Sequence, residues 1–397
     1  MKPLAAILAC AFVSASLHAS DPLFVRVAKA LTMRGRPVDH AVIAIEGGKI
    51  TRIGKDVAIP AGARVLDHST SWACPGFIDL HSHIWSEGDT NEMGHPLNPE
   101  LRTLDALVLW SETMRRASAS GVTTVLSISG SGTNFSSFGT LLKVKPVRRL
   151  EDAIVMQPGA MKVAQDWNPE RRGGDLGASR MGMSYGMRWM NDRALAHASA
   201  VRAGGPGDKE LDNLAALLQG QIPVLIHTAS ARGVMNTVRM WHDEYPTRMV
   251  LSHGCFDGWR GAAYAATRDV AINNGPRMFE FSRVDGRMHG ICAEFARAGV
   301  RRLSVNTDSP VVPQHELAFQ ASMAAWLGLP DYDALEALTY WPAEALGVDH
   351  RLGSLEPGKD ADLVITSGSP LDVRAAVELV IVDGEIVFDR RRDGERP

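Results

Sequence analysis

The sequence predicts an α/β protein: a (β/α)8 TIM barrel of parallel strands covered by helices, with a smaller β-rich part. Three observations predict it. The 397 residues suit a large barrel with a companion domain. Strand and helix patterns alternate through the middle of the chain, and hairpin patterns occupy both ends. An open doubly wound sheet is the alternative, although no G-x-G-x-x-G run follows an early strand.

The first element is an N-terminal apolar run that precedes the predicted fold. Met1-Lys2 is positively charged, residues 4–17 are apolar or small, and Leu17-His18-Ala19 resembles a cleavage site. This predicts a secretory signal peptide, residues 1–19, and therefore a periplasmic or secreted protein. The run is too short to span a membrane. A retained anchor and a lipoprotein signal at Cys10 are the alternatives, and no other membrane span is expected.

The two ends of the remaining chain share a hairpin pattern. Residues 41–45 and 50–54 are apolar runs on either side of a Gly-containing turn, and residues 377–382 and 385–388 flank Asp383-Gly384 in the same way. The simplest arrangement pairs these strands into one small sheet built from both termini.

The middle of the chain alternates short apolar strands with helical stretches. A helix is expected over residues 101–120, ending at Gly121. Strands are expected at residues 77–80, 122–126, 153–156, 160–163, 222–226, 249–252, 270–272 and 303–305.

The overall composition limits the function classes. The chain is 45% hydrophobic and 22% charged, which is typical of a packed globular protein. A net charge of −3 gives no reason to expect nucleic-acid binding. Three cysteines, Cys74, Cys255 and Cys292, follow the signal segment, and an odd number argues against a disulfide framework. They are expected to be small buried residues, although one pair could oxidise outside the cytoplasm.

Polar residues of metal-binding types occur where the predicted strands end, and this edge holds the active site in α/β barrels. They are His81 with His83, Lys162, His227, His253 and Asp308.

His81 and His83 are two residues apart, so on a strand both imidazoles point to one face. Imidazole nitrogen suits Zn²⁺ and similar divalent ions. Two histidines in a surface loop are the alternative. For His227 and His253 the alternative is a structural, hydrogen-bonded histidine. Asp308 is either a turn or N-cap aspartate or a carboxylate that takes a proton from a metal-activated water.

Lys162 has two interpretations. Burial beside cations would lower the pKa of its amine, which could then react with carbon dioxide to give a carbamate that bridges two metal ions. The alternative is a lysine whose charge is met by a carboxylate or by the substrate.

Three segments resemble the amidohydrolase superfamily of metal-dependent hydrolases, near its imidazolonepropionase- and prolidase-like branch. They are Pro75 to His83 (PGFIDLHSH), Gly121 to Val125 (GVTTV) and Leu352 to Val364 (LGSLEPGKDADLV). The resemblance covers almost the whole chain after the signal. It implies a distorted barrel over residues 75–345 and a composite β-sandwich made of residues 20–74 and 346–397.

The resemblance also implies a set of site residues. Its paired histidine ligands fall on His81 and His83, its later strand-end histidines on His227 and His253, its aspartate on Asp308, and its carboxylated lysine on Lys162. In a group of related members the run after this lysine is Lys-x-Ala-x-Gly-Glu-Asn-Pro. Here Trp167 replaces the glutamate, so any ligand role of that glutamate is absent.

The expected reaction is hydrolysis of a C–N bond in an amide, cyclic amide or dipeptide by a metal-activated water. Asp308 serves as general base, and His253, if it is not a ligand, stabilises the oxyanion. One Zn²⁺ or other divalent ion needs His81, His83, His227 and Asp308. With two ions, Lys162 bridges them and His253 binds the second.

Other functions remain open at this point. The same water could serve an esterase, lactonase or phosphotriesterase, and a non-catalytic metal-binding barrel is a further alternative. The expected partner is a small molecule such as an N-acyl amino acid or dipeptide; a homo-oligomer is left open. Asn91, Glu92 and Arg180 could line the pocket, with Arg180 on a substrate carboxylate, or could make only local surface contacts.

Overall fold

The structure is a computed structural model that describes residues 22–108, 110–171 and 179–394. The predicted signal segment, residues 1–19, lies outside the described residues. Within the described ranges, no helix has both the length and the apolarity needed to cross a membrane. Cys74, Cys255 and Cys292 are buried, as expected, and are free cysteines in the structure.

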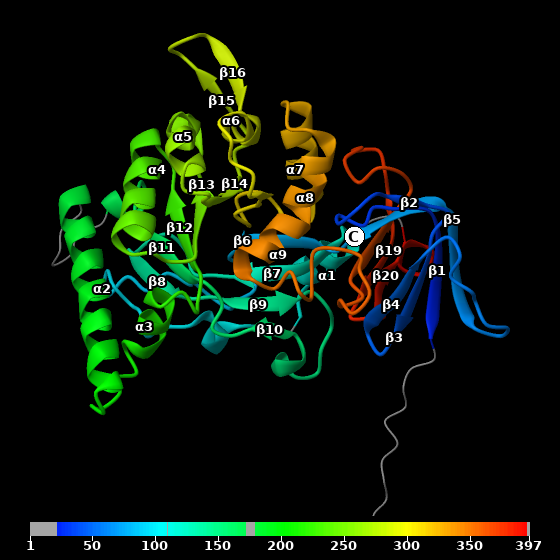
Figure 1. Cartoon of the computed structure of the whole chain (residues 1–397), viewed down its shortest axis with the longest axis horizontal. Coiled ribbons are helices and arrows are strands. Elements are labelled where there is room, and N and C mark those ends of the chain that lie inside the picture. Colours follow the sequence, from blue (N-terminus) through cyan, green and yellow to red (C-terminus); the bar gives the residue numbers. More distant parts are fainter. Residues whose placement is uncertain (1–21, 109, 172–178, 395–397) are drawn as a thin grey trace, which may run out of the picture.

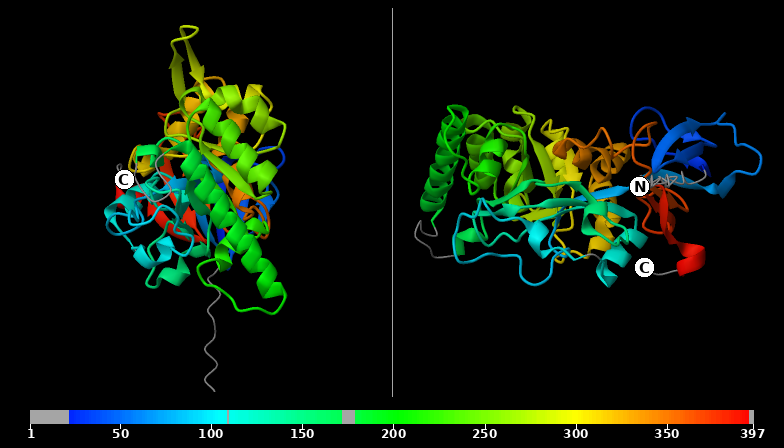
Figure 2. Two further views of the ribbon diagram at one scale, coloured as in Figure 1. Left: turned by 90° about the vertical axis from the view of Figure 1, so that its left-hand side faces the viewer. Right: turned by 90° about the horizontal axis from the view of Figure 1, so that it is seen from below.

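Strands from both ends of the chain form one eight-stranded sheet, which lies at one end of the molecule (Figures 1 and 2). Within the sheet, the two ends of the chain meet where β18 pairs antiparallel with β5, and Leu363 lies opposite Pro75. Apolar side chains from both ends, such as Ile43 and Ile381, pack in one buried cluster. The strands are β1 (Leu23–Ala30), β2 (Val38–Asp39), β3 (Val42–Glu46), β4 (Lys49–Gly54), β5 (Arg64–Pro75), β18 (Leu363–Thr366), β19 (Val377–Val382) and β20 (Glu385–Asp389).

The middle of the chain contains two further sheets, of four and six strands. In the larger sheet, β11, β12, β13, β14 and β17 run parallel to one another, so their carboxyl ends meet at one edge. The four-stranded sheet has β6 (Phe77–Ser82), β7 (Val122–Ser127), β9 (Thr140–Lys143) and β10 (Ile154–Met156). The six-stranded sheet has β8 (Phe135–Phe138), β11 (Met161–Ala164), β12 (Val224–Thr228), β13 (Met249–His253), β14 (Ala271–Asn274) and β17 (Leu303–Val305).

Two of these strands were not predicted. β9 runs antiparallel to β7, and β8 antiparallel to β11. Gly139 separates β8 from β9, and a Cβ there would lie 2.7 Å from the carbonyl oxygen of Ser127. Only glycine fits so close an approach, so the passage from β8 to β9 requires a glycine at this position.

The helix predicted over residues 101–120 is only half correct. Residues Thr103–Ala106 form a short 3₁₀ turn, and the α-helix α1 spans Glu112–Ala119. The hydroxyl of Ser111 accepts a hydrogen bond from the backbone NH of Met114 and caps the start of α1. This cap places the helix start about ten residues later than the apolar spacing suggested.

Helices lie against the strands of the middle region, and a hairpin made of β15 (Phe279–Ser282) and β16 (Arg287–Gly290) projects beyond them (Figure 1). The α/β class is therefore confirmed. The helices are α2 (Arg180–Arg202), α3 (Asp212–Leu218), α4 (Ala231–Val238), α5 (Ala262–Ala266), α6 (Ile291–Arg297), α7 (Leu317–Trp326), α8 (Asp331–Leu338) and α9 (Tyr340–Leu346), with α10 (Arg390–Asp393) near the end of the chain.

Candidate metal centre

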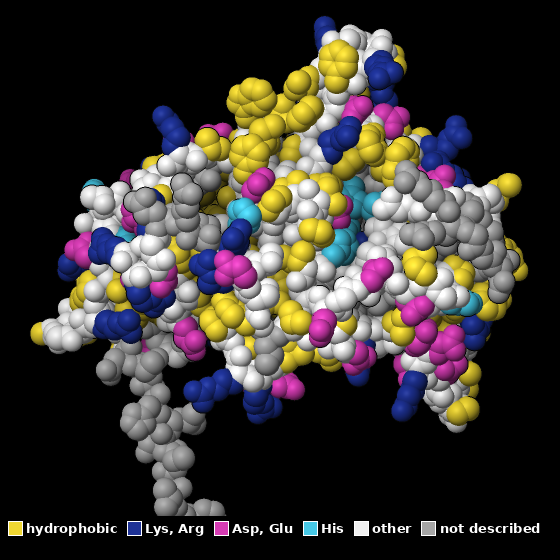
Figure 3. Space-filling view, turned by 180° about the vertical axis from the view of Figure 1, so that it is seen from behind, with side chains coloured by type: hydrophobic (Ala, Val, Ile, Leu, Met, Phe, Trp, Pro, Cys, Tyr) yellow, Lys and Arg dark blue, Asp and Glu magenta, His cyan; other side chains and the backbone are white. Residues whose placement is uncertain are grey.

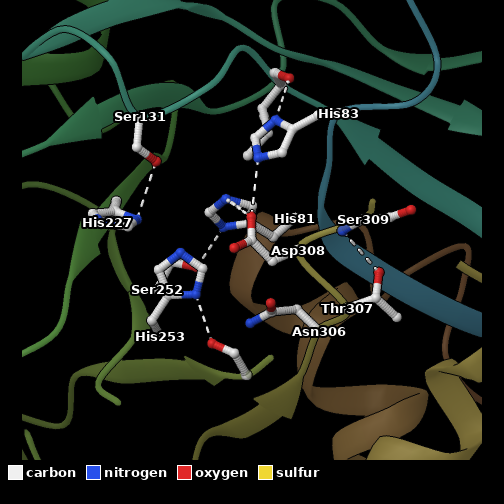
Figure 4. Close-up of polar contacts among 12 residues, drawn as sticks. His81, His83, Ser131, His227, Ser252, His253, Asn306, Thr307, Asp308 and Ser309 are labelled. Carbon is white, nitrogen blue, oxygen red and sulfur yellow. Dashed lines mark hydrogen bonds and ion pairs between the residues drawn. The ribbon is translucent and has the colours of Figure 1, made fainter. Parts of the chain in front are cut away.

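The six candidate residues at the strand ends lie close together in the structure, although they are far apart in the sequence. Figure 4 shows His81, His83 and His253 gathered around the Asp308 carboxylate, with His227 to one side. The ring of His253 lies with its centroid 4.4 Å from that of His81 and 4.5 Å from that of His227. The parallel strands produce this convergence because each one delivers its polar residue to the same edge.

The strands hold these residues in different ways. His81 lies inside β6 and His83 directly after it, while His253 is the last residue of β13. The turn that carries Asp308 is joined to the end of β6, because the backbone NH of His83 donates to the carbonyl of Ser309 at 2.9 Å. This bond brings the first and last parts of the site together.

His83 and Asp308 form a contact that suits a cation. Nδ1 of His83 lies 3.0 Å from the carbonyl oxygen of Ile128, which can only accept, so this nitrogen carries the proton. A neutral His83 therefore turns the Nε2 lone pair toward Oδ1 of Asp308, 3.0 Å away. Two acceptors this close need a positive charge between them, either a proton or a metal ion.

His253 and His227 each have one buried ring nitrogen without a partner. Nδ1 of His253 donates to the carbonyl of Gly275 at 2.6 Å, which leaves the Nε2 lone pair free. Nδ1 of His227 contacts the hydroxyl of Ser131 at 3.0 Å. The Nε2 atoms of both histidines are buried without a hydrogen-bond partner among the described residues. Buried polar atoms are rarely left unpaired, so these two are suited to hold a ligand.

Lys162 lies deeper in the same cluster and is fully buried. Its Nζ is 3.1 Å from Nε2 of His81 and donates to the carbonyl of Ser129 at 3.3 Å. Burial lowers the pKa of Lys162 to about 7, with only the charge of Asp308 opposing the change. Part of the Lys162 population is therefore a neutral, nucleophilic amine near neutral pH.

The charges of the cluster are those of a metal-binding site. Burial lowers the pKa of His81 and His227 well below the usual histidine range, and it lowers that of His253 as well. Burial alone would raise the pKa of Asp308, but the neighbouring His253, His83 and Lys162 hold it below its usual range. Neutral imidazoles beside an ionised carboxylate are the forms that ligate a metal.

The donor set fits a divalent ion. The ligand atoms of His81, His83 and Asp308 all lie within 4.8 Å of one another. Nitrogen and carboxylate oxygen are ligands that Zn²⁺ accepts, and the free Nε2 atoms of His227 and His253 can complete its coordination. Lys162 could join this set only as its carbamate, because an amine that keeps its proton cannot ligate.

Two of the residues carry unusual backbone angles. His253 has a φ of 77° and Asp308 a φ of 50°, both in the left-handed region that side chains rarely adopt. Such conformations cluster at functional sites, where the surrounding structure holds them in place.

Asp79 lies in the PGFIDLHSH segment, and the sequence alone predicts no role for it. Its Oδ1 accepts from the backbone NH of His81 at 2.9 Å, and its Oδ2 accepts from the Thr307 hydroxyl and the Gln314 amide, both at 2.6 Å. Burial raises the pKa of Asp79 to about 6, although these donors oppose the change. Asp79 thus connects the residue before Asp308 with the strand of His81. A carboxylate inside an otherwise apolar strand was the available signal.

Other supporting residues gave little signal in the sequence. The hydroxyl of Ser252 lies 2.7 Å from Nδ1 of His81, and that of Ser131 contacts His227. Serine is common in every strand and loop, so only the folded arrangement identifies these two as partners that orient the imidazoles.

The structure gives the contacts of the three residues considered for the pocket lining. Arg180 pairs with Asp166 at 2.8 Å and with Glu170 at 2.9 Å. Oδ1 of Asn91 accepts from the NH of Gly132 at 3.0 Å, and the Glu92 carboxylate accepts from the NH of Gly94. Asn91 is thereby placed one residue from Ser131, whereas Arg180 is committed to two carboxylates.

Comparison with known proteins agrees with this geometry. Residues 326–388 match the amidohydrolase family. An imidazolonepropionase from Brucella anthropi is 27% identical over 86% of this chain and 89% of its own length. The amidohydrolase tasK from Hapsidospora irregularis is 25% identical over 87% of this chain, which spans 40% of that longer protein.

A solved structure covers the fold almost completely. The amidohydrolase from Thermotoga maritima superposes with a TM-score of 0.83 and 28% identity, over 93% of this chain and 100% of the other. The resemblance to the amidohydrolase superfamily that the sequence motifs indicate is therefore confirmed, and the fold is of the mixed α/β type found in that superfamily.

Proposed function

We propose that this protein is a metal-dependent hydrolase that cleaves a C–N bond of a small amide, with Asp308 as the general base. One observation carries the proposal: the ligand atoms of His81, His83 and Asp308 converge within 4.8 Å. The names of its relatives, an imidazolonepropionase and amidohydrolases, support the reaction class.

In this proposal His81, His83, His227 and Asp308 hold the ion, which is Zn²⁺ or a similar divalent metal. When bound, such an ion polarises the scissile carbonyl and lowers the pKa of a coordinated water toward roughly 7. The carboxylate of Asp308 is ionised and is mostly buried, so it can accept the proton of the attacking water and then deliver it to the leaving nitrogen.

His253 has the features of a ligand rather than an oxyanion donor. Its Nδ1–H is committed to Gly275, so donation from Nε2 would need a doubly protonated ring. The lowered pKa of His253 opposes that form. We therefore assign His253 to a second metal ion.

Lys162 is the residue that decides between one and two ions. A neutral amine attacks carbon dioxide, a C–N bond forms and a proton is lost, giving a carbamate with two ligand oxygens. The burial of Lys162, its pKa of about 7 and its 3.1 Å contact with His81 support this modification. We propose a binuclear site bridged by carboxylated Lys162.

The finer architecture is part of the same proposal. We propose that the four- and six-stranded sheets are the two parts of a distorted barrel over residues 75–345, and that the shared terminal sheet belongs to a composite β-sandwich. The isolated bridge between Ser82 and Ser309, which connects the two parts, supports the first of these assignments.

The direct test is metal analysis of the purified protein followed by a hydrolysis screen. We expect one or two equivalents of a divalent metal per chain, and turnover of N-acyl amino acids or dipeptides that a chelator abolishes and added Zn²⁺ restores. Matched esters and lactones test the competing reaction class. Protein from metal-replete medium that contains no metal, or amide turnover that survives complete chelation, would contradict the proposal.

A further inference from the structure

Three loops at the edge of the metal centre carry large side chains that the proposed chemistry does not use. Trp167 follows β11, Phe256 follows β13 and Arg277 follows β14. These three strands also carry Lys162, His253 and the Asn274 next to Gly275, the partner of His253. The loops therefore leave the same edge of the sheet at which the metal ligands meet.

The loop that carries Trp167 is tied to the end of β12, the strand of His227. Its neighbour Asp166 accepts hydrogen bonds from the Ser230 hydroxyl at 2.7 Å and from the hydroxyl of Thr228, the residue after His227. The backbone NH of Trp167 donates to Glu170 at 2.9 Å.

The indole of Trp167 lies against the ring of Phe256, with centroids 5.1 Å apart and planes inclined by 35°. Trp167 keeps 43% of its surface exposed, which is unusual for so large an apolar side chain. In the view of Figure 3, histidine side chains reach the surface with hydrophobic side chains beside them. The aromatic pair thus offers an open apolar surface at the edge of the site.

Both aromatic residues have strained backbones. Trp167 has a φ of 75° and Phe256 a φ of 52°. Bulky residues are genuine outliers in this region, and the two site residues His253 and Asp308 share the feature. Strained backbone conformations tend to cluster at functional sites, so their occurrence in several loops at this edge of the sheet indicates that the side chains have a functional arrangement.

Arg277 adds a positive charge to the pair. Its guanidinium lies over the Phe256 ring, 4.7 Å from the centroid, and its carbonyl accepts from the thiol of Cys255. The guanidinium pairs with Glu280 at 3.2 Å, and about half of the Arg277 side chain is exposed to solvent. Exposed pairs contribute little, so a substrate carboxylate can replace Glu280.

We infer that Trp167, Phe256 and Arg277 form a specificity subsite for an aromatic amino-acid unit of the substrate. The aromatic ring stacks on the exposed indole of Trp167, which Phe256 supports from behind, and the free carboxylate pairs with Arg277. The inference rests on the proposed amide hydrolysis and narrows its substrates to N-acyl aromatic amino acids and dipeptides that end in an aromatic residue.

The test compares N-acetyl-L-phenylalanine, N-acetyl-L-alanine and N-acetyl-L-phenylalaninamide. The metal-loaded wild-type protein should prefer the phenylalanine acid to the alanine acid in kcat/KM by about tenfold or more. Trp167→Ala and Phe256→Ala should reduce this ratio to below about threefold. Arg277→Gln should remove the preference for the acid over the carboxamide and keep the preference for phenylalanine. Trp189→Ala, another exposed tryptophan (42%) on α2, is the matched control and should change neither ratio.

Binding to the metal-loaded Asp308→Asn protein, measured by calorimetry, separates this inference from the proposed reaction. If that protein prefers phenylalanine through Trp167 but the wild type hydrolyses no amide, the subsite stands and the proposed function fails. If amides are hydrolysed without a preference for phenylalanine, or if Trp167→Ala and Phe256→Ala keep the preference in both rate and affinity, the subsite is overturned. Circular dichroism and metal content check that each variant is folded.

Discussion

Nε2 of His83 lies 3.0 Å from Oδ1 of Asp308, although 225 positions separate the two residues in the sequence. Because Nδ1 of His83 donates to Ile128, both facing atoms are acceptors unless a proton or a metal ion lies between them. A hydrogen bond from the backbone of His83 to Ser309 holds the same two segments together. A backbone hydrogen bond therefore fixes the relative position of His83 and Asp308, in addition to their side-chain contact.

This relationship makes Asp308 the first residue to test. Asp308→Asn keeps a ligand oxygen but removes the carboxylate that accepts the proton. We expect the variant to bind metal and to lose turnover by a factor on the order of 10²–10⁴, measured as kcat on the best amide of the screen with metal content in parallel. Asp56→Asn, at an exposed position with the same charge change, is the control. Turnover within twofold of wild type in Asp308→Asn would remove Asp308 from the mechanism.

Lys162 tests the number of metal ions. Lys162→Ala should lower the metal content from two equivalents to one and reduce activity strongly, because the bridging oxygens are lost. Depleting carbon dioxide during metal loading should lower wild-type activity, and bicarbonate should restore it. Lys55→Ala, an exposed lysine, should keep both metals. One equivalent per chain in wild type and Lys162→Ala alike would refute the bridging role.

Asp79 should affect activity by holding His81 and Thr307, and through them the metal centre, in position. Asp79→Asn puts an amide donor against the donors of Thr307 and Gln314, and we expect unfolding to become easier by about 1–3 kcal/mol. We also expect kcat to fall at least tenfold, since small displacements of reacting groups are costly. Thr307→Val, which removes one of the donors, should give a smaller loss of both quantities. Urea unfolding and kcat together check this, and an Asp79→Asn protein with wild-type kcat would show that Asp79 does not position the site.

Asp360 should make stability depend on pH in the acid range. Burial would raise the pKa of its carboxyl, but Lys143, Lys49 and Arg351 lower it to about 2. A lowered pKa in the folded state contributes stability above the unfolded value of about 3.9, and this is lost as the pH falls through about 2. Asp360→Asn should therefore cost about 2 kcal/mol at pH 7 and roughly half of that at pH 3. Urea unfolding of both proteins at the two pH values measures the difference, with Asp56→Asn as the control. A cost that does not fall with pH would assign the effect to packing.

Much of the site could be predicted because strand alternation and strand ends are local properties. The spacing of His81 and His83 places both rings on one side of a strand, and the strand patterns before His227 and His253 lead to the same edge. Neither inference requires knowledge of distant contacts. The prediction of a helix over residues 101–120 was wrong in its first half. It relied on apolar spacing alone, which does not show that the helix begins only after the Ser111 cap.

Other features depend on groups that meet only in the folded chain. The antiparallel pairings of β8 with β11 and of β9 with β7, and the close approach of Gly139 to Ser127 between these strands, are contacts that no local pattern reveals. The partners of the imidazoles, Ser252 and Ser131, are ordinary residues in sequence. Arg180 was a plausible substrate ligand until the structure placed it against Asp166 and Glu170.

The chain's local patterns were thus enough to predict an α/β fold, a resemblance to amidohydrolases and the candidate residues of the proposed metal centre. These are set by side-chain periodicity and by residue type, which can be read over a few positions. The free Nε2 atoms of His227 and His253, the low pKa of Lys162 and the contact of Trp167 with Phe256 arise from tertiary structure. Burial, desolvation and contacts between distant segments do not exist until the strands have come together.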